Sequence, residues 1–337
     1  MCAAAVFAAT LCDTARAQDK VYKLAGSTLT GELRSTSPNE VIIAVRGKDE
    51  NVPIDEVQRV LFDGEPSELT RAKESAALGQ WEQAAEQLKE VDAASLTDEA
   101  VKQDYQYYRS LVAARLALAG QGNVGAAAAA MLTYAKANPR SHHFYELAEV
   151  VGALAAASGS QADAVKYYTA IGNAPFPAYK LKSAYLVGTA LLTEGKAAEA
   201  RAEFEKVKSA TAPDPASQRY QKLAGVAAIR ADIVAGDAAA AVESLLAMVA
   251  EGDSTDALLF GEIYNTLGEA HLKLSQPGEA RLAYLHTDLL FPGDPDNHAE
   301  ALYNLGQLWE QGGEPQRATD ARARLKERYA NTAWARK

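Results

Sequence analysis

Two adjacent histidines, His142 and His143, are the side chains best suited to bind a metal ion. Imidazole nitrogens are common zinc ligands, but a zinc site needs further ligands at a suitable spacing. Neighbouring residues of a helix point about 100° apart, and no cysteine or carboxylate stands at ligand spacing from the pair. We therefore expect no metal at these histidines.

A denser polar group between residues 294 and 300 could coordinate a hard cation through oxygen atoms. It consists of Asp294, Asp296, Asn297, His298 and Glu300. The same residue types also follow turns and begin helices, where an Asp or Asn side chain accepts hydrogen bonds from free backbone amides. We interpret the group as a turn and a helix cap, so the sequence predicts no metal and no cofactor.

The motifs of common enzyme classes are missing from the sequence. It contains no glycine-rich phosphate loop, no GxSxG and no HExxH. The segment GQGNVG at 120–125 resembles a dinucleotide-binding fingerprint, but no strand precedes it, which indicates a turn between helices. His271 and His286 fall on separate predicted helices, where we expect packing or surface roles. The sequence therefore predicts a protein that is not an enzyme.

Composition and charge narrow the class of protein and of partner. The 337 residues are 48% hydrophobic and 23% charged, as in ordinary globular proteins, and many alanines with few Phe and Trp favour closely packed helices. The net charge of -10 repels phosphate backbones and anionic lipid surfaces, and no cluster of Lys and Arg offsets it. We therefore expect no nucleic-acid partner.

The N-terminal stretch MCAAAVFAATLC, followed by DTARAQ, has the form of a signal peptide. We predict a signal peptide over residues 1–17, cleaved after Ala17, and export to the periplasm or cell envelope. Cleavage removes Cys2 and Cys12, the two cysteines of the chain. Because Cys12 follows Leu11 rather than a small residue, we expect no lipid anchor, and membrane contact only if one were attached. An uncleaved flexible tail is the alternative.

The elements that position these residues change character along the chain. Between residues 18 and 65, short apolar runs with strand-like alternation are separated by turn signals at 25–26, 37–39 and 46–49. This predicts a small antiparallel β-barrel-like module, whose segment VPIDEVQRVLFDG resembles the last strands of SH3-like and Sm-like barrels. After the Gly-Pro linker at 63–66, the apolar spacing becomes that of helices, which predicts a helical array over residues 66–337.

A repeat decides the fold of this helical part. In each unit a Gly, or Ser275 in the sixth, stands five residues before an Ala, and a Gly can end one helix in the left-handed conformation. The pairs are Gly79–Ala84, Gly122–Ala127, Gly159–Ala164, Gly195–Ala200, Gly236–Ala241, Ser275–Ala280 and Gly313–Ala318. About seven antiparallel helix pairs follow. Their predicted units lie near residues 67–95, 98–138, 141–174, 178–212, 215–251, 255–292 and 297–330.

Small and large residues alternate across each predicted hairpin. We expect Gly188, Gly268 and Gly306 in the first helices to face Ala200, Ala280 and Ala318 in the second, so that the helix axes approach closely. Large residues one turn later, Phe204 and Tyr284, are expected to fill the gap against the next unit.

The last two units resemble two successive tetratricopeptide repeats. Tyr264, Leu267, Gly268, Ala280, Tyr284 and Pro292 match the signature positions of that family in order, and Gly188, Ala200 and Phe204 match it in the fourth unit. The resemblance implies a mainly all-α solenoid whose concave face, lined by the first helix of each unit, binds peptides. The first, second and fifth units match less well and are equally compatible with generic helical hairpins.

The register of the family assigns specific residues to the concave face. They are Lys182, Tyr185, Arg230, Asn265, Lys273 and Tyr303. Their cationic, amide and aromatic groups suit an extended peptide, although the same pattern also fits an ordinary solvated helix face. The sequence thus predicts a non-catalytic scaffold of the cell envelope with a protein or peptide partner. The alternatives are self-assembly into homo-oligomers and a glycan or small-molecule site between the β-module and the first unit.

Overall fold

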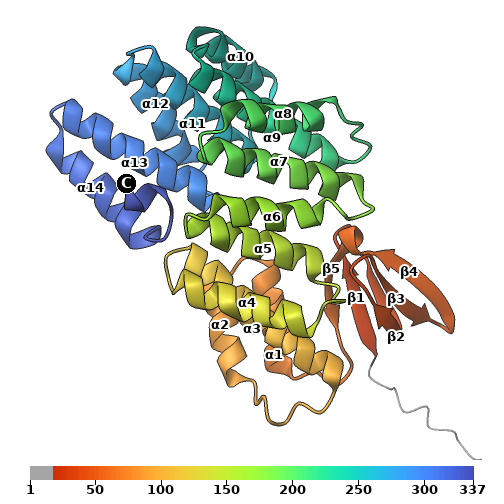
Figure 1. Cartoon of the computed structure of the whole chain (residues 1–337). Coiled ribbons are helices and arrows are strands. Elements are labelled where there is room, and N and C mark those ends of the chain that lie inside the picture. The colour runs from red at the N-terminus through yellow and green to blue at the C-terminus, as the bar shows by residue number, and fades with distance from the viewer. Residues whose placement is uncertain (1–17) are drawn as a thin grey trace, which may run out of the picture.

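The structure is a computed structural model that describes residues 18–337 (Figure 1). The signal peptide predicted for residues 1–17 lies outside the described residues. The described chain begins with a small antiparallel sheet and continues as an array of helices. The predicted fold class, a mainly helical repeat array behind a small antiparallel β-structure, is confirmed.

The sheet has five antiparallel strands in the order β4-β3-β2-β1-β5. They are β1 (Asp19–Lys23), β2 (Thr28–Thr36), β3 (Glu40–Val45), β4 (Lys48–Pro53) and β5 (Val57–Leu61), with the 3-10 turn η1 (Ile54–Glu56) before β5. Alternating residues such as Val41 and Ile43 face the core, as the sequence pattern indicates. A Cβ on Gly31 would lie 2.1 Å from the carbonyl oxygen of Ala44, so only glycine fits where β2 crosses β3. Among the described strands the edges β4 and β5 do not pair with each other.

The helices form consecutive antiparallel hairpins. In chain order they are α1 (Ser67–Ala77), α2 (Trp81–Glu90), α3 (Glu99–Leu118), α4 (Val124–Ala137), α5 (Phe144–Ala157), α6 (Gln161–Ile171), α7 (Pro177–Thr193), α8 (Ala197–Ser209), α9 (Pro215–Ala235), α10 (Ala238–Glu251), α11 (Ala257–Lys273), α12 (Pro277–Leu290), α13 (Pro295–Gln311) and α14 (Pro315–Arg328), followed by the 3-10 turn η2 (Trp334–Arg336). Each odd-numbered helix packs against the even-numbered helix that follows it.

Most hairpin turns have the left-handed residue that the sequence predicts. Positive φ angles occur at Gly79, Gly159, Gly195, Gly236, Ser275 and Gly313. The prediction was wrong for the second hairpin, where Gly120 has φ 92° and Gly122 does not have a positive φ. Gly122 instead packs against Ala117, and Asn123 caps α4 by accepting a hydrogen bond from the amide of Ala126. The longer loop therefore moves the left-handed position two residues earlier.

In three of the hairpins, α5–α6, α7–α8 and α11–α12, an aromatic ring of the second helix lies on a glycine of the first. A Cβ on Gly188 of α7 would lie 2.5 Å from the ring of Phe204 on α8, and one on Gly268 of α11 equally close to the ring of Tyr284 on α12. Each glycine and its ring belong to the same hairpin. The rings also belong to apolar clusters with the next unit, Phe204 with Leu223 of α9 and Tyr284 with Leu302 of α13, as expected.

The second-helix alanines Ala200, Ala280 and Ala318 are buried as expected. In the last hairpin Gly306 faces the aliphatic part of Arg322 instead of an aromatic ring. A long cationic side chain thus takes the place of the ring in the terminal unit.

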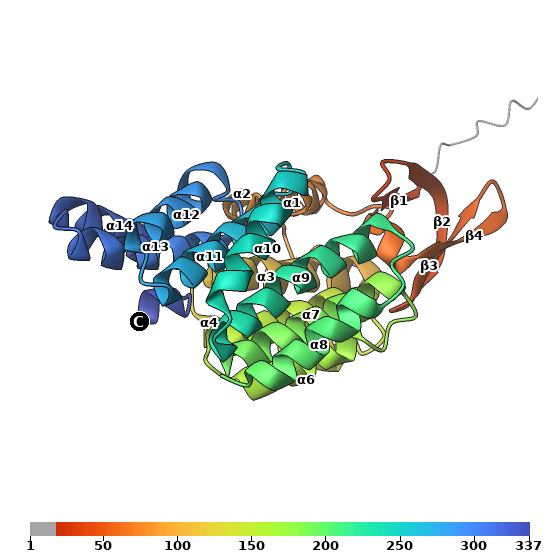
Figure 2. The same cartoon turned by 90° about the horizontal axis from the view of Figure 1, so that it is seen from above.

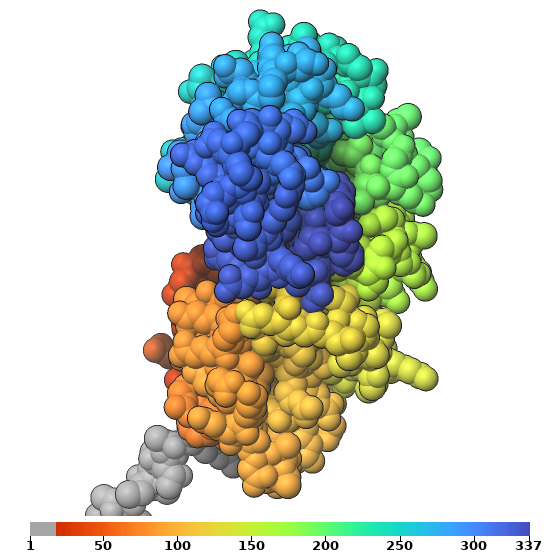
Figure 3. All heavy atoms as spheres, turned by 90° about the vertical axis from the view of Figure 1, so that its left-hand side faces the viewer, coloured from red at the N-terminus to blue at the C-terminus, as the bar shows by residue number. Residues whose placement is uncertain are grey.

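The array curves enough for its last unit to contact its second one. Asn331, just after α14, donates hydrogen bonds from Nδ2 to the carbonyl oxygens of Ala117 and Gly122, at 2.7 and 2.9 Å. Figure 3 shows the blue C-terminal residues against the yellow surface near α4. Figure 2 shows the sheet projecting at one end of the molecule and α13 and α14 at the other.

Candidate functional site

The first helices of the later hairpins stand side by side. Helix α9 packs against both α7 and α11, and α11 packs against α13. All six residues predicted for the concave face lie on these four helices. We refer to the surface that they share as the inner face.

The side chains predicted for the inner face on α7 are engaged within the protein, which the sequence does not indicate. Lys182 forms an ion pair with Glu149 of α5, which raises its pKa despite burial. Tyr185, one turn further along α7, is almost completely buried. Lys273, at the end of α11, is exposed. Of these three predicted residues, only Lys273 therefore presents a free side chain to solvent.

The structure brings two of the predicted residues, Arg230 and Asn265, together around a third group, Glu300. The Arg230 Nη2 atom lies 2.7 Å from Glu300 Oε1, its Nε atom 3.3 Å from Glu269 Oε2, and its Nη1 atom 3.6 Å from Glu262 Oε2. One guanidinium therefore faces three carboxylates, which come from α11 and α13. We call Arg230, Glu262, Asn265, Glu269 and Glu300 the Arg230 cluster.

Asn265 occupies the buried floor of this cluster. Its side chain has no solvent exposure, and its Nδ2 atom donates to the Asn297 carbonyl oxygen at 2.8 Å and to Glu300 Oε2 at 3.2 Å. Its Oδ1 atom has no hydrogen-bond partner within residues 18–337. An unpaired buried acceptor is energetically costly, so Asn265 has spare capacity for a donor.

Burial and excess negative charge raise the proton affinity of this region. Burial, opposed by Arg230 and reinforced by Glu300, raises the pKa of Glu262 to about 7. Burial and the neighbouring Asp294 raise the pKa of Asp296 to about 6. The pKa of Glu269 is raised for the same reason, mainly by burial. The one arginine therefore does not compensate the carboxylates around it.

Tyr303 of α13 lies beneath the end of the chain. Its ring is 5.6 Å from that of Trp334 in η2, and the ammonium of Lys337 lies 5.5 Å from its centroid. The C-terminal segment thus covers the α13 end of the inner face. The sequence reasoning did not anticipate this contact.

The three glutamates of the Arg230 cluster were missed as site residues by the sequence analysis, although Glu300 was considered as part of the capping group. Glu262 and Glu269 stand three residues before and four residues after Asn265, which places all three on one side of α11. This spacing was a usable signal. The contact of Glu300 with Arg230, 70 positions away, depends on how the hairpins stack and is not visible in local spacing.

Within the group at 294–300, the predicted helix cap is confirmed for Asp294. Asp294 Oδ1 accepts a hydrogen bond from the Asn297 amide at 2.9 Å and caps α13. His298 is buried and is hydrogen-bonded to Asp288 and to the Tyr329 hydroxyl, at 2.8 and 2.7 Å. Arg324 completes this network through Asp288, at 2.5 Å. The network joins α12, α13 and α14.

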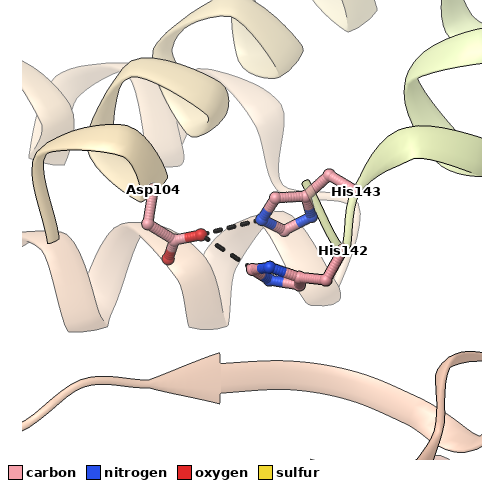
Figure 4. Close-up of side chains that lie close together, drawn as sticks. All are labelled: Asp104, His142 and His143. Atoms are coloured by element: carbon pink, nitrogen blue, oxygen red, sulfur yellow. Dashed lines mark hydrogen bonds and ion pairs between the residues drawn. The ribbon is translucent and has the colours of Figure 1, made fainter. Parts of the chain in front are cut away.

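A second polar cluster contains the two histidines considered first (Figure 4). They precede α5 rather than lying within a helix, and both point toward Asp104 of α3 (Figure 4). His143 Nε2 lies 2.7 Å from Asp104 Oδ1, and one ligand-type atom from each of the three residues falls within 4.8 Å of the others. The expectation that no carboxylate stands at ligand distance was therefore wrong.

A buried lysine gives this second cluster a structural explanation. Lys73 of α1 contacts Asp104, lies 2.5 Å from Glu65 Oε2, and donates to the Val60 carbonyl oxygen of β5 at 3.1 Å. Burial would raise the pKa of Asp104, but Lys73 and the hydrogen bond from His143 outweigh it and hold that pKa below its usual range. Because the ammonium already compensates Asp104, a metal ion would have to compete with it.

A cavity of about 340 Å³ lies beside this cluster, between the β-sheet and the second hairpin. Its lining includes Thr36 and Phe62 on one side and Gln103, Asn138 and His142 on the other. The Nε2 atom of His142 is buried without a hydrogen-bond partner in the described part of the chain. Burial lowers the pKa of His142 to about 3, so this imidazole is neutral at physiological pH.

Comparisons with known proteins support the fold through solved structures and not through family models or curated sequences. No protein-family model matches the chain, and it has no significant match among the curated proteins. None of the helices within residues 18–337 is both long and apolar enough to cross a membrane.

Solved structures resemble it at low sequence identity. A tetratricopeptide repeat protein from Parabacteroides merdae is 12% identical with a TM-score of 0.51, over 77% of this chain and 91% of that one. NprR in complex with its cognate peptide NprX is 13% identical with a TM-score of 0.40, over 77% and 76%. The Parabacteroides likeness, together with the stacked hairpins, shows that the chain has the fold of a tetratricopeptide-like helical repeat array.

Proposed function

We propose that the protein is a non-catalytic interaction scaffold that binds a segment of a partner protein along the inner face of α7, α9, α11 and α13. The observation that carries this proposal is the Arg230 cluster. It is a set of half-buried charges with a fully buried, unpaired acceptor on the face where tetratricopeptide-like arrays bind peptides. A merely solvated helix face has no reason to bury such groups.

We further propose that the protein acts in the cell envelope after export. The signal-like sequence at residues 1–17 supports this assignment. The β-module, for which we propose an SH3-like architecture, is tied to the array by Lys73 and by the hydrogen bond from the Tyr145 hydroxyl to Asn39 Oδ1, at 2.9 Å. It would hold the first hairpins in place or contact a second partner.

Site-specific photo-crosslinking tests the binding face. A photoreactive residue at Lys273, exposed on α11 beside the cluster, should crosslink to a defined partner in envelope fractions. The matched control position is Glu243, which is exposed on the second helix α10. Equal crosslinking from both positions, or none from Lys273, would count against the inner face as the binding surface.

The cavity beside His142 favours a second candidate function, the binding of a small polar ligand between the β-module and the array. Its polar lining and its unpaired imidazole nitrogen are the supporting observations. Thermal-shift measurements with soluble cell-wall fragments test it. A shift that disappears in His142→Phe would support the site, and the absence of any shift would remove this candidate.

Self-assembly into homo-oligomers is the alternative to binding a partner protein. Sedimentation velocity over a range of protein concentrations tests it directly. A concentration-independent profile of a monomer would exclude homo-oligomers as the functional form.

A further inference from the structure

We propose that the Arg230 cluster is a pocket for a basic side chain, a lysine or an arginine, of the bound partner segment. This inference rests on the proposed function and names the chemistry of the ligand. It is carried by the charge balance of the cluster and by its unpaired, fully buried acceptor.

The charged groups in contact with Arg230 carry a net negative charge. Three carboxylates, those of Glu262, Glu269 and Glu300, lie within 3.6 Å of the Arg230 guanidinium. Asp294 and Asp296, at the start of α13, add to the negative potential at Glu262. Carboxylates that lose water without gaining a full counter-charge destabilise the free protein, and a ligand cation would relieve that cost.

Two further cations face the cluster and do not balance it. Lys273 and Lys337 both lower the pKa of Glu269 by their charge, but both side chains are exposed. The nearby Tyr185 hydroxyl is neutral at physiological pH, because burial raises its pKa well above the ordinary value. The three glutamates thus face one half-buried cation and two solvated ones, and the charge of Arg219 acts on Asp294.

The hydrogen-bonding capacity points to a donor-rich ligand. The free Oδ1 atom of Asn265 and the carboxylate oxygens accept hydrogen bonds only, and the one buried donor of the cluster without a hydrogen bond in the described chain, Arg230 Nε, already faces Glu269 Oε2 at 3.3 Å. A lysine ammonium offers three donors and an arginine guanidinium five, whereas a carboxylate ligand offers none. An acidic segment would therefore leave Asn265 unpaired and add repulsion.

The chain itself places a cation at the rim of this pocket. The Lys337 ammonium lies 3.5 Å from the centroid of the Trp334 ring and 5.5 Å from that of Tyr303. Burial lowers the pKa of Lys337, and the opposing charges of Glu300 and Glu269 offset this effect only in part. Aromatic faces beside carboxylates are a favourable environment for an ammonium. The C-terminal segment thus places an ammonium over two aromatic rings near the cluster.

The protonation state of Glu262 should change when a basic side chain binds, and this change can be measured. Its raised pKa, about 7, brings its titration into the neutral pH range. A bound cation favours the ionised carboxylate, so binding releases a proton and tightens as the pH rises from about 6 to 8.

Fluorescence anisotropy with short labelled peptides and the full chain tests the proposal. The peptides share degenerate uncharged flanks and carry Lys, Arg, Leu or Glu at the central position. We expect Lys- and Arg-centred peptides to bind about tenfold more tightly than Leu-centred ones, and Glu-centred peptides to bind most weakly. Raising the salt concentration should reduce this difference.

Matched variants test whether the preference for basic peptides arises at the Arg230 cluster. Glu262→Gln should remove most of the preference for basic peptides and the pH dependence of their binding, whereas Glu243→Gln on exposed α10 should change neither. Circular dichroism of each variant confirms that it folds. Because Glu262 is the carboxylate farthest from Arg230, its replacement is the least disruptive of the three.

The outcomes separate this inference from the proposed function. Binding of Leu- or Glu-centred peptides at least as tight as that of basic ones overturns the basic-side-chain pocket and leaves the scaffold intact. A preference for basic peptides that persists unchanged in Glu262→Gln also overturns it. Failure of every peptide class to bind contradicts the inner-face scaffold itself.

Discussion

At the scale of the residue, the fit between glycines and aromatic rings fixes the spacing of the helices within a hairpin. The ring of Tyr284 lies on the backbone of Gly268, and the ring of Phe204 lies on that of Gly188. Both rings are almost completely buried. Interiors are packed too densely to absorb an added methyl group at such a contact.

Gly268→Ala should lower the free energy of unfolding by about 1–3 kcal/mol, since the new Cβ would lie 2.5 Å from the Tyr284 ring. The control is Gly278→Ala in α12, where no atom lies within 4 Å of the added Cβ. There the better helix propensity of alanine should stabilise the protein by up to about 1 kcal/mol. Urea denaturation measures both. Equal effects at the two sites would contradict the packing explanation.

A single carboxylate, Glu262, also sets a pH dependence of stability. Its pKa is about 7 in the folded chain against an ordinary value of 4.5, so the folded state holds a proton that the unfolded state releases in this range. The contribution of Glu262 to the free energy of unfolding is therefore fully present below about pH 4.5 and is lost as the pH rises through about 7.

Glu262→Gln should therefore gain stability relative to the unchanged protein as the pH rises from 5 to 8, by about 1–3 kcal/mol. Thermal or urea denaturation at several pH values measures the difference. A stability difference that does not change with pH, or that grows toward acid, would show that the carboxyl titrates near its ordinary value.

At the scale of the element, one buried lysine connects the sheet, the linker and two helices. Lys73 of α1 contacts Val60 of β5, Glu65 of the linker and Asp104 of α3. All three charged side chains are at most 3% exposed. A buried ion pair adds little stability overall, but the loss of one partner leaves the others uncompensated.

Lys73→Ala should therefore destabilise the protein by about 3–5 kcal/mol, because two buried carboxylates lose their counter-charge. Lys89→Ala provides the control, since its ion pair with Glu86 is largely exposed and should contribute less than about 1 kcal/mol. Chemical denaturation followed by circular dichroism measures both. Similar small effects for the two variants would contradict the connecting role of Lys73.

The elements were predictable because their signals are local. Strand alternation before residue 62 and the Gly–Ala spacing after residue 67 each reflect the geometry of a few neighbouring residues. The turn at Gly120 was assigned two residues late because the second hairpin has a longer loop. The contact of Asp104 with His143 could not be predicted, since it joins residues 39 positions apart whose approach depends on how α3 and α5 pack.

The candidate site was predictable only in part. The family register placed Arg230 and Asn265 on the inner face, and the structure brings both onto Glu300. The negative charge around them was missed, because the spacing of Glu262 and Glu269 on α11 was not used and Glu300 joins them only through the stacking of α13. Local spacing thus indicates which face is used, whereas the chemistry of the pocket depends on the stacking of several hairpins.

At the scale of the whole molecule, the array bends until its C-terminal end contacts its second hairpin. Asn331 bridges the carbonyl oxygens of Ala117 and Gly122, and a Cβ on Gly120 would lie 2.9 Å from the amide nitrogen of Ala330. This contact links units that are far apart in sequence, whereas the repeats of most such arrays touch only their neighbours.

Asn331→Ala should loosen this closure without unfolding the hairpins. Two hydrogen bonds are lost, which should cost about 1 kcal/mol, because the Ala117 carbonyl keeps its hydrogen bond from the Gly120 amide and Gly122 is exposed to water. Amide hydrogen exchange should become faster at residues 329–337 and at the α3–α4 turn. Gln316→Ala, whose hydrogen bond is local to exposed α14, should leave both segments unchanged. Unaltered exchange in Asn331→Ala would show that the contact does not restrain the ends of the array.

Binding at the inner face is tested by an amide hydrogen-exchange footprint of the full chain with and without a saturating Lys-centred peptide. We expect slower exchange in α9, α11 and α13 around the Arg230 cluster, with little change in α8, α10 and α12. Protection confined to those outer helices or to the β-sheet would contradict the assignment of the inner face as the binding surface.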